Sequence, residues 1–127
     1  MKPFGFSKNE RLCSKKAIDT VFSEGKNKFS FPLKARFTID NLALSQEPLQ
    51  ALFVVPKRAF KKAVTRNAIR RRIKEAYRLN KHVLIEWCIK NEKSIRLIFF
   101  YLGTENPDFS KLQKSIQNII KELTGRT

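Results

Sequence analysis

Residues 51–102 read ALFVV at 51–55, VTRNAIRRRIKEAYRLNKHVLIEWCIK at 64–90 and IRLIFFYL at 95–102. The two outer runs are apolar and too short for helices, so they predict buried strands. The middle run repeats apolar residues at helical spacing and predicts one long helix, from about Val64 to about Lys90. Two strands that flank a long helix favour a parallel pair joined by a crossover.

The segment before this unit predicts a helix followed by strand. Ser14 can cap a short helix that Gly25 ends. Every second residue from Phe29 to Ile39 is apolar, which predicts a strand with one buried and one basic face. Pro32 cannot donate to a strand ladder and marks either an edge position or a break into two pieces. Residues 41–49 predict a turn.

The segment after this unit predicts a last helix, capped by Asp108 or Ser110. Its apolar stripe consists of Leu112, Ile116, Ile119, Ile120 and Leu123. The expected fold is therefore α+β, a single-domain α/β sandwich with the element order αβββαβα.

Composition indicates one domain with a polyanionic partner. The 127 residues suit a single domain, 1–127, in which residues 1–11 are a loose basic tail. Hydrophobic residues make up 42% of the chain, so a core can be buried, but a net charge of +16 opposes compaction unless a polyanion neutralises it. The sequence has no apolar run near the roughly 18 residues of a membrane-spanning helix. Its two distant cysteines suit a reducing, cytoplasmic compartment.

The positive charge is concentrated between Lys57 and Lys81, where eleven Lys and Arg residues accompany one acid, Glu75. The net charge of this stretch is +10, as expected for a nucleic-acid footprint. At about 100° per residue, Ile69 and Ile73 lie on an apolar face of the helix. Five cations lie on the neighbouring face, between about 240° and 340°: Arg70, Arg71, Lys74, Arg78 and Lys81.

This cationic face places like charges four residues apart, as in Arg66 with Arg70 and Lys74 with Arg78. Each such pair costs about 0.2–0.5 kcal/mol in an isolated helix. A phosphate backbone reverses the sign of that cost and releases counterions on binding. The pattern therefore favours RNA or DNA over a merely solvated face.

Residues 63–78, AVTRNAIRRRIKEAYR, resemble the signature of the protein subunit of bacterial ribonuclease P. Arg11-Leu12, with Val21-Phe22 and Gly25, is similar to the first helix of that family. Val55-Pro56-Lys57-Arg58 stands where the family has a strand that ends in basic residues. The resemblance covers roughly residues 11–123. Ala68 departs from it, because the family usually has a basic residue there, so one contact is missing or is supplied by Arg72.

The resemblance implies a ribonucleoprotein endonuclease that removes the 5′ leader from precursor tRNA. The active site then lies in the RNA subunit, which requires Mg²⁺, so no catalytic residue, metal site or bound cofactor is expected in this chain. The resemblance also implies a monomer in a 1:1 complex with the RNA subunit, without membrane or DNA partners. It implies a left-handed crossover through the Arg-Asn helix, although right-handed connections are the rule.

The resemblance also implies two sets of contacts. The leader of precursor tRNA is expected in a cleft between the first helix and the sheet, at Ile18, Phe22, Lys34 and Arg36. Phe22 is as well suited to the hydrophobic core as to the leader cleft. Asn67, which the resemblance places at the RNA subunit, is as well suited to a hydrogen bond with nearby backbone. Ile18 stands where the family often has a second aromatic. The RNA subunit is expected at Lys57, Arg58, Lys61, Lys62, Arg66, Asn67, Arg70, Arg71, Lys74 and Arg78.

Three other functions share parts of this pattern. A protein-only nuclease needs clustered carboxylates or histidines, but His82 is the only histidine and the acids are scattered. A ribosomal or general RNA-binding protein fits the composition equally well. Only the Arg66-Asn67 signature, and its position between two strands, favours the ribonuclease P family over that alternative. DNA binding by the long helix is less favoured because no helix-turn-helix signal precedes it.

Overall fold

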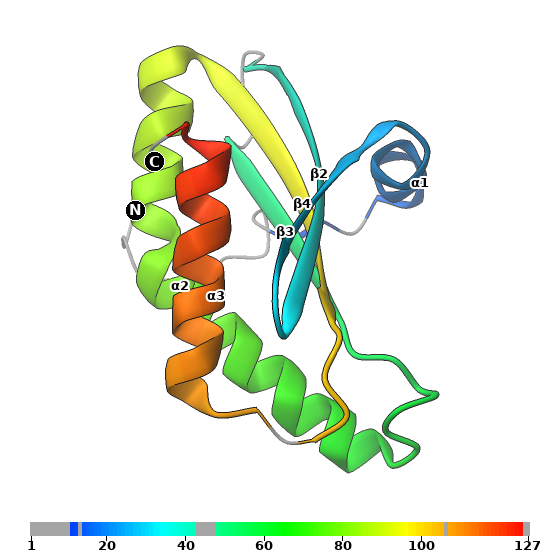
Figure 1. The fold of residues 1–127 in the computed structure, drawn as a ribbon. Coiled ribbons are helices and arrows are strands. Elements are labelled where there is room, and N and C mark those ends of the chain that lie inside the picture. The colour runs from blue at the N-terminus through cyan, green and yellow to red at the C-terminus, as the bar shows by residue number, and fades with distance from the viewer. Residues whose placement is uncertain (1–10, 13, 43–47, 106, 126–127) are drawn as a thin grey trace.

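The computed structural model describes residues 11–12, 14–42, 48–105 and 107–125. In these residues the elements follow the predicted order αβββαβα, with four strands in one sheet (Figure 1). The elements are α1 (Lys15–Glu24), β1 (Lys26–Ser30), β2 (Leu33–Asn41), β3 (Leu49–Val54), α2 (Ala63–Asn91), β4 (Lys93–Tyr101) and α3 (Phe109–Leu123).

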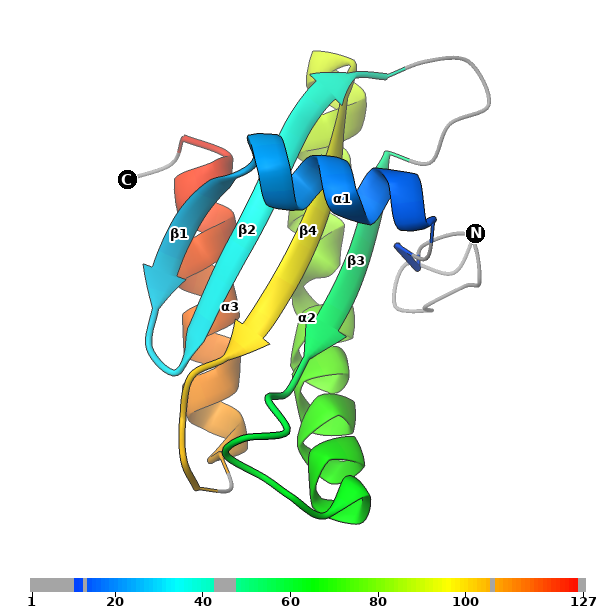
Figure 2. The same ribbon diagram turned by 90° about the vertical axis from the view of Figure 1, so that its right-hand side faces the viewer.

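The strands lie in the order β1-β2-β4-β3, and β3 and β4 are the predicted parallel pair. The β1–β2 and β2–β4 pairs are antiparallel. Figure 2 views the sheet from the α1 side: β3 and β4 point down, β4 lies to the left of β3, and α2 passes behind. A path from β3 through α2 to β4 is therefore left-handed, as the resemblance implied and against the usual rule.

Helices cover the two faces of the sheet unequally. Helices α2 and α3 pack side by side on one face, and α1 alone crosses the other (Figures 1 and 2). The larger core lies between the sheet and the helix pair, where the rings of Phe53, Tyr77 and Phe99 lie within 5.5–5.6 Å of one another between centroids. The smaller core, around Val21 and Ile98, lies under α1 and leaves part of that face uncovered.

The predicted caps are found at two helices. The Ser14 hydroxyl accepts from the backbone N–H of Ala17 at 3.4 Å, and Gly25 ends α1. Of the two candidates for α3, Asp108 is the cap, because its carboxylate accepts from the Ser110 N–H at 3.2 Å. The predicted stripe of α3 is buried along its whole length.

Pro32 breaks the predicted strand into two pieces, and this break changes which residues are buried. Leu33, Ala35 and Phe37 are buried as predicted. Phe29 and Phe31 are 62% and 77% exposed, so the prediction that they belong to the same buried face was wrong. The reason is the turn at residues 31–32, which pairs Ser30 with Leu33 and so shifts the alternation by one residue. Ile39, near the end of β2, is also exposed.

Two predicted segments fall partly outside the described residues: the basic tail at 1–10 and the turn at 43–47. Arg11, which the sequence assigned to the tail, instead forms an isolated parallel bridge with Ala51 on the free edge of β3. The backbone N–H of Leu12 donates to the Ala51 carbonyl at 3.0 Å. Within the described part of the chain, no helix is long and apolar enough to span a membrane.

Candidate nucleic-acid interface

The first turn of α2 is unusually electropositive. A helix N-terminus carries a partial positive charge and normally attracts acidic side chains. Here the first turn holds no acid, and the N-cap residue, Lys62, makes no side-chain capping bond. This end of α2 is therefore suited to bind phosphate. The loop before it adds exposed cations, at Lys57, Arg58 and Lys61.

Arg66 attaches this loop to the helix. Its Nη1 donates to the carbonyl of Phe60 at 2.7 Å and to the carbonyl of Lys61 at 2.9 Å. The half-buried guanidinium thus fixes the loop cations relative to α2. Its geometry supports a positioning role, in addition to any contact with a phosphate.

Asn67 and Arg70 are coupled by a side-chain hydrogen bond, in which Arg70 Nη1 donates to Asn67 Oδ1 at 2.6 Å. The sequence favoured either a bond from Asn67 to nearby backbone or a direct RNA contact. The bond found here is a different one, and it orients the Arg70 guanidinium on the surface of α2.

Lys74 lies in a cluster of like charges. Partial burial, reinforced by the nearby charges of Arg11 and Arg70, lowers the pKa of its ammonium group below the usual value. Arg11 stands on the edge of β3 and Arg70 one turn earlier on α2. Three cations from two segments therefore converge, and an anion bound there would relieve their repulsion.

Three further arginines of α2 differ in their surroundings. Arg71 is exposed. Arg78 forms an ion pair with Glu75, which offsets part of its charge. Arg72 Nη1 donates to the carbonyl of Pro107 at 3.2 Å and so links α2 to the loop before α3. Ala68 lies one turn before Arg72, and both residues line an open surface hollow. Because residue 68 is an alanine, it presents no positive charge there.

Lys81 does not belong to the exposed cationic face, contrary to the sequence prediction. It is only 1% exposed, like the neighbouring core positions Tyr77 and Leu84. On the helix it lies beside the buried positions Tyr77 and Cys88, so the buried arc of α2 includes it. The cationic face therefore ends at Arg78.

On the other side of the sheet, Phe22 and Lys34 meet at Phe100. The Phe22 and Phe100 rings lie edge-on with centroids 5.9 Å apart, and Lys34 Nζ lies 4.7 Å from the Phe100 centroid. Phe22 is 47% exposed, so it is not a plain core residue. Ile18 is half-buried and packs on the small core below α1. Aromatic rings beside an ammonium group suit unpaired bases and their phosphates.

Arg36, also predicted for this cleft, is engaged with the end of α1. Its Nε donates to the carbonyls of Val21 and Phe22, both at 3.0 Å, and its Nη2 donates to Phe22 at 2.5 Å. Its Nη1 donates to Asn27 Oδ1 at 3.1 Å. These bonds satisfy the last carbonyls of α1 and hold that helix against β2.

The two surfaces meet around the free edge of β3. Helix α2 lies behind β3 and α1 crosses in front of it (Figure 2). Arg11, at that edge, acts on the charge of Lys74. The structure thus gathers most of the predicted RNA-subunit residues on and before α2, and the predicted leader residues on the opposite face.

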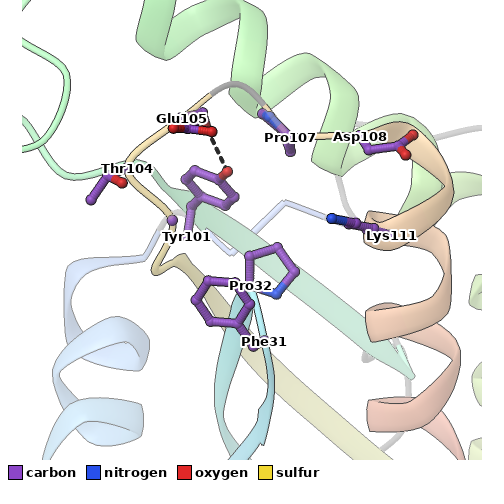
Figure 3. Close-up of a pocket in the computed structure, with 9 residues that line it drawn as sticks. Phe31, Pro32, Tyr101, Thr104, Glu105, Pro107, Asp108 and Lys111 are labelled. Atoms are coloured by element: carbon purple, nitrogen blue, oxygen red, sulfur yellow. Dashed lines mark hydrogen bonds between the residues drawn. The ribbon is translucent and has the colours of Figure 1, made fainter.

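A pocket at the bottom of the molecule was not predicted from the sequence. It lies between the β1–β2 turn and the start of α3, where Phe31 and Pro32 face Tyr101 (Figure 3). The Tyr101 hydroxyl donates to the Glu105 carbonyl at 2.5 Å. Its charged lining residues are Glu105, Asp108 and Lys111, so carboxylates and an ammonium group are both present. In the described residues, no three His, Cys, Asp or Glu side chains are grouped closely enough to hold a metal.

Comparison with known proteins gives a consistent result. The sequence model described as "Ribonuclease P" matches residues 6–124. The chain is 34% identical over 125 residues to the ribonuclease P protein component of Porphyromonas gingivalis W83, covering 96% of this chain and 88% of that relative. The counterpart in Chlorobaculum tepidum is 29% identical over 122 residues, covering 86% and 76%.

Solved structures share the fold. The ribonuclease P protein from Thermotoga maritima has a TM-score of 0.68 at 23% identity, covering 89% of this chain and 96% of that one. The Staphylococcus aureus ribonuclease P protein has a TM-score of 0.65 at 15% identity, covering 90% and 94%. The sequence match thus extends over most of the chain, and the fold agrees with it.

Proposed function

Because the chain belongs to the ribonuclease P protein family, we propose that it is the protein subunit of a ribonucleoprotein endonuclease that removes the 5′ leader from precursor tRNA. The RNA subunit carries the active site and uses Mg²⁺ to activate water for phosphodiester hydrolysis. This chain binds one RNA subunit as a monomer, in the cytoplasm, and contributes binding rather than catalytic groups.

The observation that carries this proposal is the convergence of Arg11, Arg70 and Lys74 at the edge of β3. Burial contributes most to the lowered pKa of the Lys74 ammonium group, and the nearby charges of Arg11 and Arg70 lower that pKa further, so the three cations repel one another in the free protein. A protein that needed only stability would separate them or interleave acids. A folded RNA, which presents dense phosphate, compensates for that repulsion. The RNA-subunit surface comprises these three cations with Arg66, Asn67, Arg71, Arg78 and the loop cations Lys57, Arg58, Lys61 and Lys62.

The leader of precursor tRNA is assigned to the opposite face. The leader is single-stranded, so its unpaired bases are free to stack on exposed aromatic rings, whereas the bases of a duplex are already stacked on one another. Phe22 and Phe100 provide the rings and Lys34 the ammonium group. Arg36 and Ile18 serve this site indirectly, because they hold α1 in place.

The test is reconstitution with the RNA subunit encoded in the same genome. At low Mg²⁺, where phosphate repulsion is poorly screened, the protein should raise the rate of precursor tRNA cleavage above that of the RNA alone. The protein without RNA should cleave nothing. A lysine-rich peptide of equal charge is the control for simple neutralisation. The proposal fails if the protein stimulates cleavage no more than the peptide does.

A further inference from the structure

Strand β1 places one more aromatic residue on the face that holds the proposed leader site. Phe29 of β1 pairs with Lys34 of β2, and Lys34 pairs with Phe100 of β4. Residues directly opposite each other in a sheet project from the same face. Phe29, Lys34 and Phe100 therefore form one row across three strands, on the α1 side.

The neighbouring residue supports this assignment of faces. Ser30, next to Phe29, accepts a hydrogen bond at its Oγ from Asn118 of α3 at 3.3 Å. Ser30 thus faces the helix pair, and Phe29 projects from the opposite side because successive residues of a strand alternate. The side chain is 62% exposed, although it sits on the outer edge strand of the sheet, where an exposed ring favours unwanted association.

The spacing and charge of the row suit single-stranded RNA. Adjacent strands lie about 4.8 Å apart, so the backbones of Phe29 and Phe100 are roughly 10 Å apart, with Lys34 between them. The exposed ring of Phe29 can receive one base and the exposed ring of Phe22, beside Phe100, a second, while the ammonium group of Lys34 meets a phosphate. Strand β1 itself holds two lysines, Lys26 and Lys28, and no acid. These charges therefore favour a nucleic acid or an acidic protein as the partner over a basic protein.

We propose that Phe29 is a base-stacking platform, which extends the leader site across the sheet to β1. The leader crosses the strands from the Phe22–Phe100 pair toward Phe29, and its phosphates pass Lys34. This inference rests on the proposed function and adds a residue and a consequence to it: affinity depends on leader length until the leader reaches β1.

Phe31 provides a matched control on the same hairpin. It is also an exposed phenylalanine, but it lies at the turn beside the pocket lined by Glu105 and Asp108 (Figure 3). Because it lies in the turn between Ser30 and Leu33, Phe31 is not part of the row of Phe29, Lys34 and Phe100. Phe31→Ala removes the same side chain without touching the row.

The experiment measures the affinity of the reconstituted ribonucleoprotein for precursor tRNAs whose leaders are shortened one nucleotide at a time. Phe29→Ala should weaken binding of the long-leader substrates by about tenfold, the effect of losing one base–aromatic stack. It should not change binding of the shortest-leader substrate. Phe29→Trp should keep wild-type affinity, whereas Phe29→Leu, apolar but unable to stack in the same way, should resemble Phe29→Ala. Phe31→Ala should match the wild type throughout.

The outcomes separate this inference from the proposed function. If the wild-type protein stimulates cleavage but Phe29→Ala binds every substrate as tightly, the platform is wrong and the proposed function stands. The platform is also wrong if Phe29→Ala weakens all substrates equally, or if Phe29→Leu restores affinity, since either result indicates a structural role. If the wild-type protein stimulates cleavage of no substrate, the proposed function itself fails.

Discussion

At the scale of single residues, several cations of this protein serve different purposes. Arg66 holds the loop before α2, and Arg36 holds the end of α1, both through backbone carbonyls. Lys74, by contrast, is partly buried and lies among other cations, and its pKa is lowered for both reasons. The sequence identified all three as basic surface residues. It could not separate them, because the same guanidinium or ammonium group can bind a carbonyl or a phosphate.

Replacing Lys74 by Gln should stabilise the free protein and weaken its binding to the RNA subunit. Removing a like-charge neighbour from Arg70 is worth about 0.2–0.5 kcal/mol, or roughly 1–2 °C in Tm. Because the folded-state pKa of Lys74 is lowered, its repulsion is present at neutral pH and is relieved as the pH rises through that pKa. The stability gain should therefore shrink at alkaline pH. Thermal unfolding at several pH values and RNA-subunit binding measure both effects.

Lys90→Gln is the control for this prediction. Lys90 lies in the last turn of the same helix, where a cation is favourable, and it is exposed. Lys90→Gln should lower the Tm slightly or leave it unchanged, and it should not affect binding to the RNA subunit. A Lys74→Gln protein that is less stable than wild type at neutral pH would contradict the claim that Lys74 is retained at a cost.

At the scale of elements, α1 is held on the sheet by the small core around Val21 and by one polar side chain from β2. The Arg36 guanidinium connects the last carbonyls of α1 with Asn27 of β1, and so sets the distance between Phe22 and the sheet. The sequence predicted a basic residue on this face, but it was assigned to the leader. The structure gives it a positioning role.

Arg36→Lys distinguishes these two roles. Lysine keeps the positive charge but loses the planar fork that reaches several acceptors at once. Arg36→Lys and Arg36→Ala should both destabilise the protein, by about 1–2 kcal/mol in urea unfolding, after allowance for partial exposure. Both should weaken binding of long-leader precursor tRNA, while leaving RNA-subunit affinity unchanged. If Arg36→Lys binds long-leader precursor tRNA as tightly as wild type whereas Arg36→Ala does not, then residue 36 contributes only its positive charge and the positioning role is wrong.

The elements themselves were largely predictable, and the failure at β1 has a simple physical cause. Periodicity of 3.6 identified α2 and α3, and dense apolar runs identified β3 and β4, because burial on one or both faces leaves those patterns. The alternation from Phe29 to Ile39 is the same on both sides of Pro32. Periodicity cannot register a turn that shifts the pairing by one residue, and so Phe29 was assigned to the wrong face.

At the scale of the whole molecule, two proposed RNA-binding surfaces are joined at one sheet edge. The cationic face of α2 and the aromatic cluster of Phe22 and Phe100 lie on opposite sides of the sheet, and Arg11 lies at the edge between them. The concentration of charge was visible in the sequence, but its end was not. Lys81 has the right spacing for the cationic face, but it is 1% exposed and belongs to the buried arc of α2.

The salt dependence of RNA-subunit binding tests most directly whether the cationic face of α2 exists to bind RNA. Replacing Arg70 and Lys74 together by Ala removes two proposed phosphate contacts, so the slope of log K against log salt should become shallower by about 0.7–0.9 per contact. A double variant of Lys90 and Lys114, which removes two exposed charges from outside this face, should keep the wild-type slope. Circular dichroism should show that both proteins are folded. An Arg70→Ala, Lys74→Ala protein that is folded and keeps the wild-type slope would contradict the proposed role of this face.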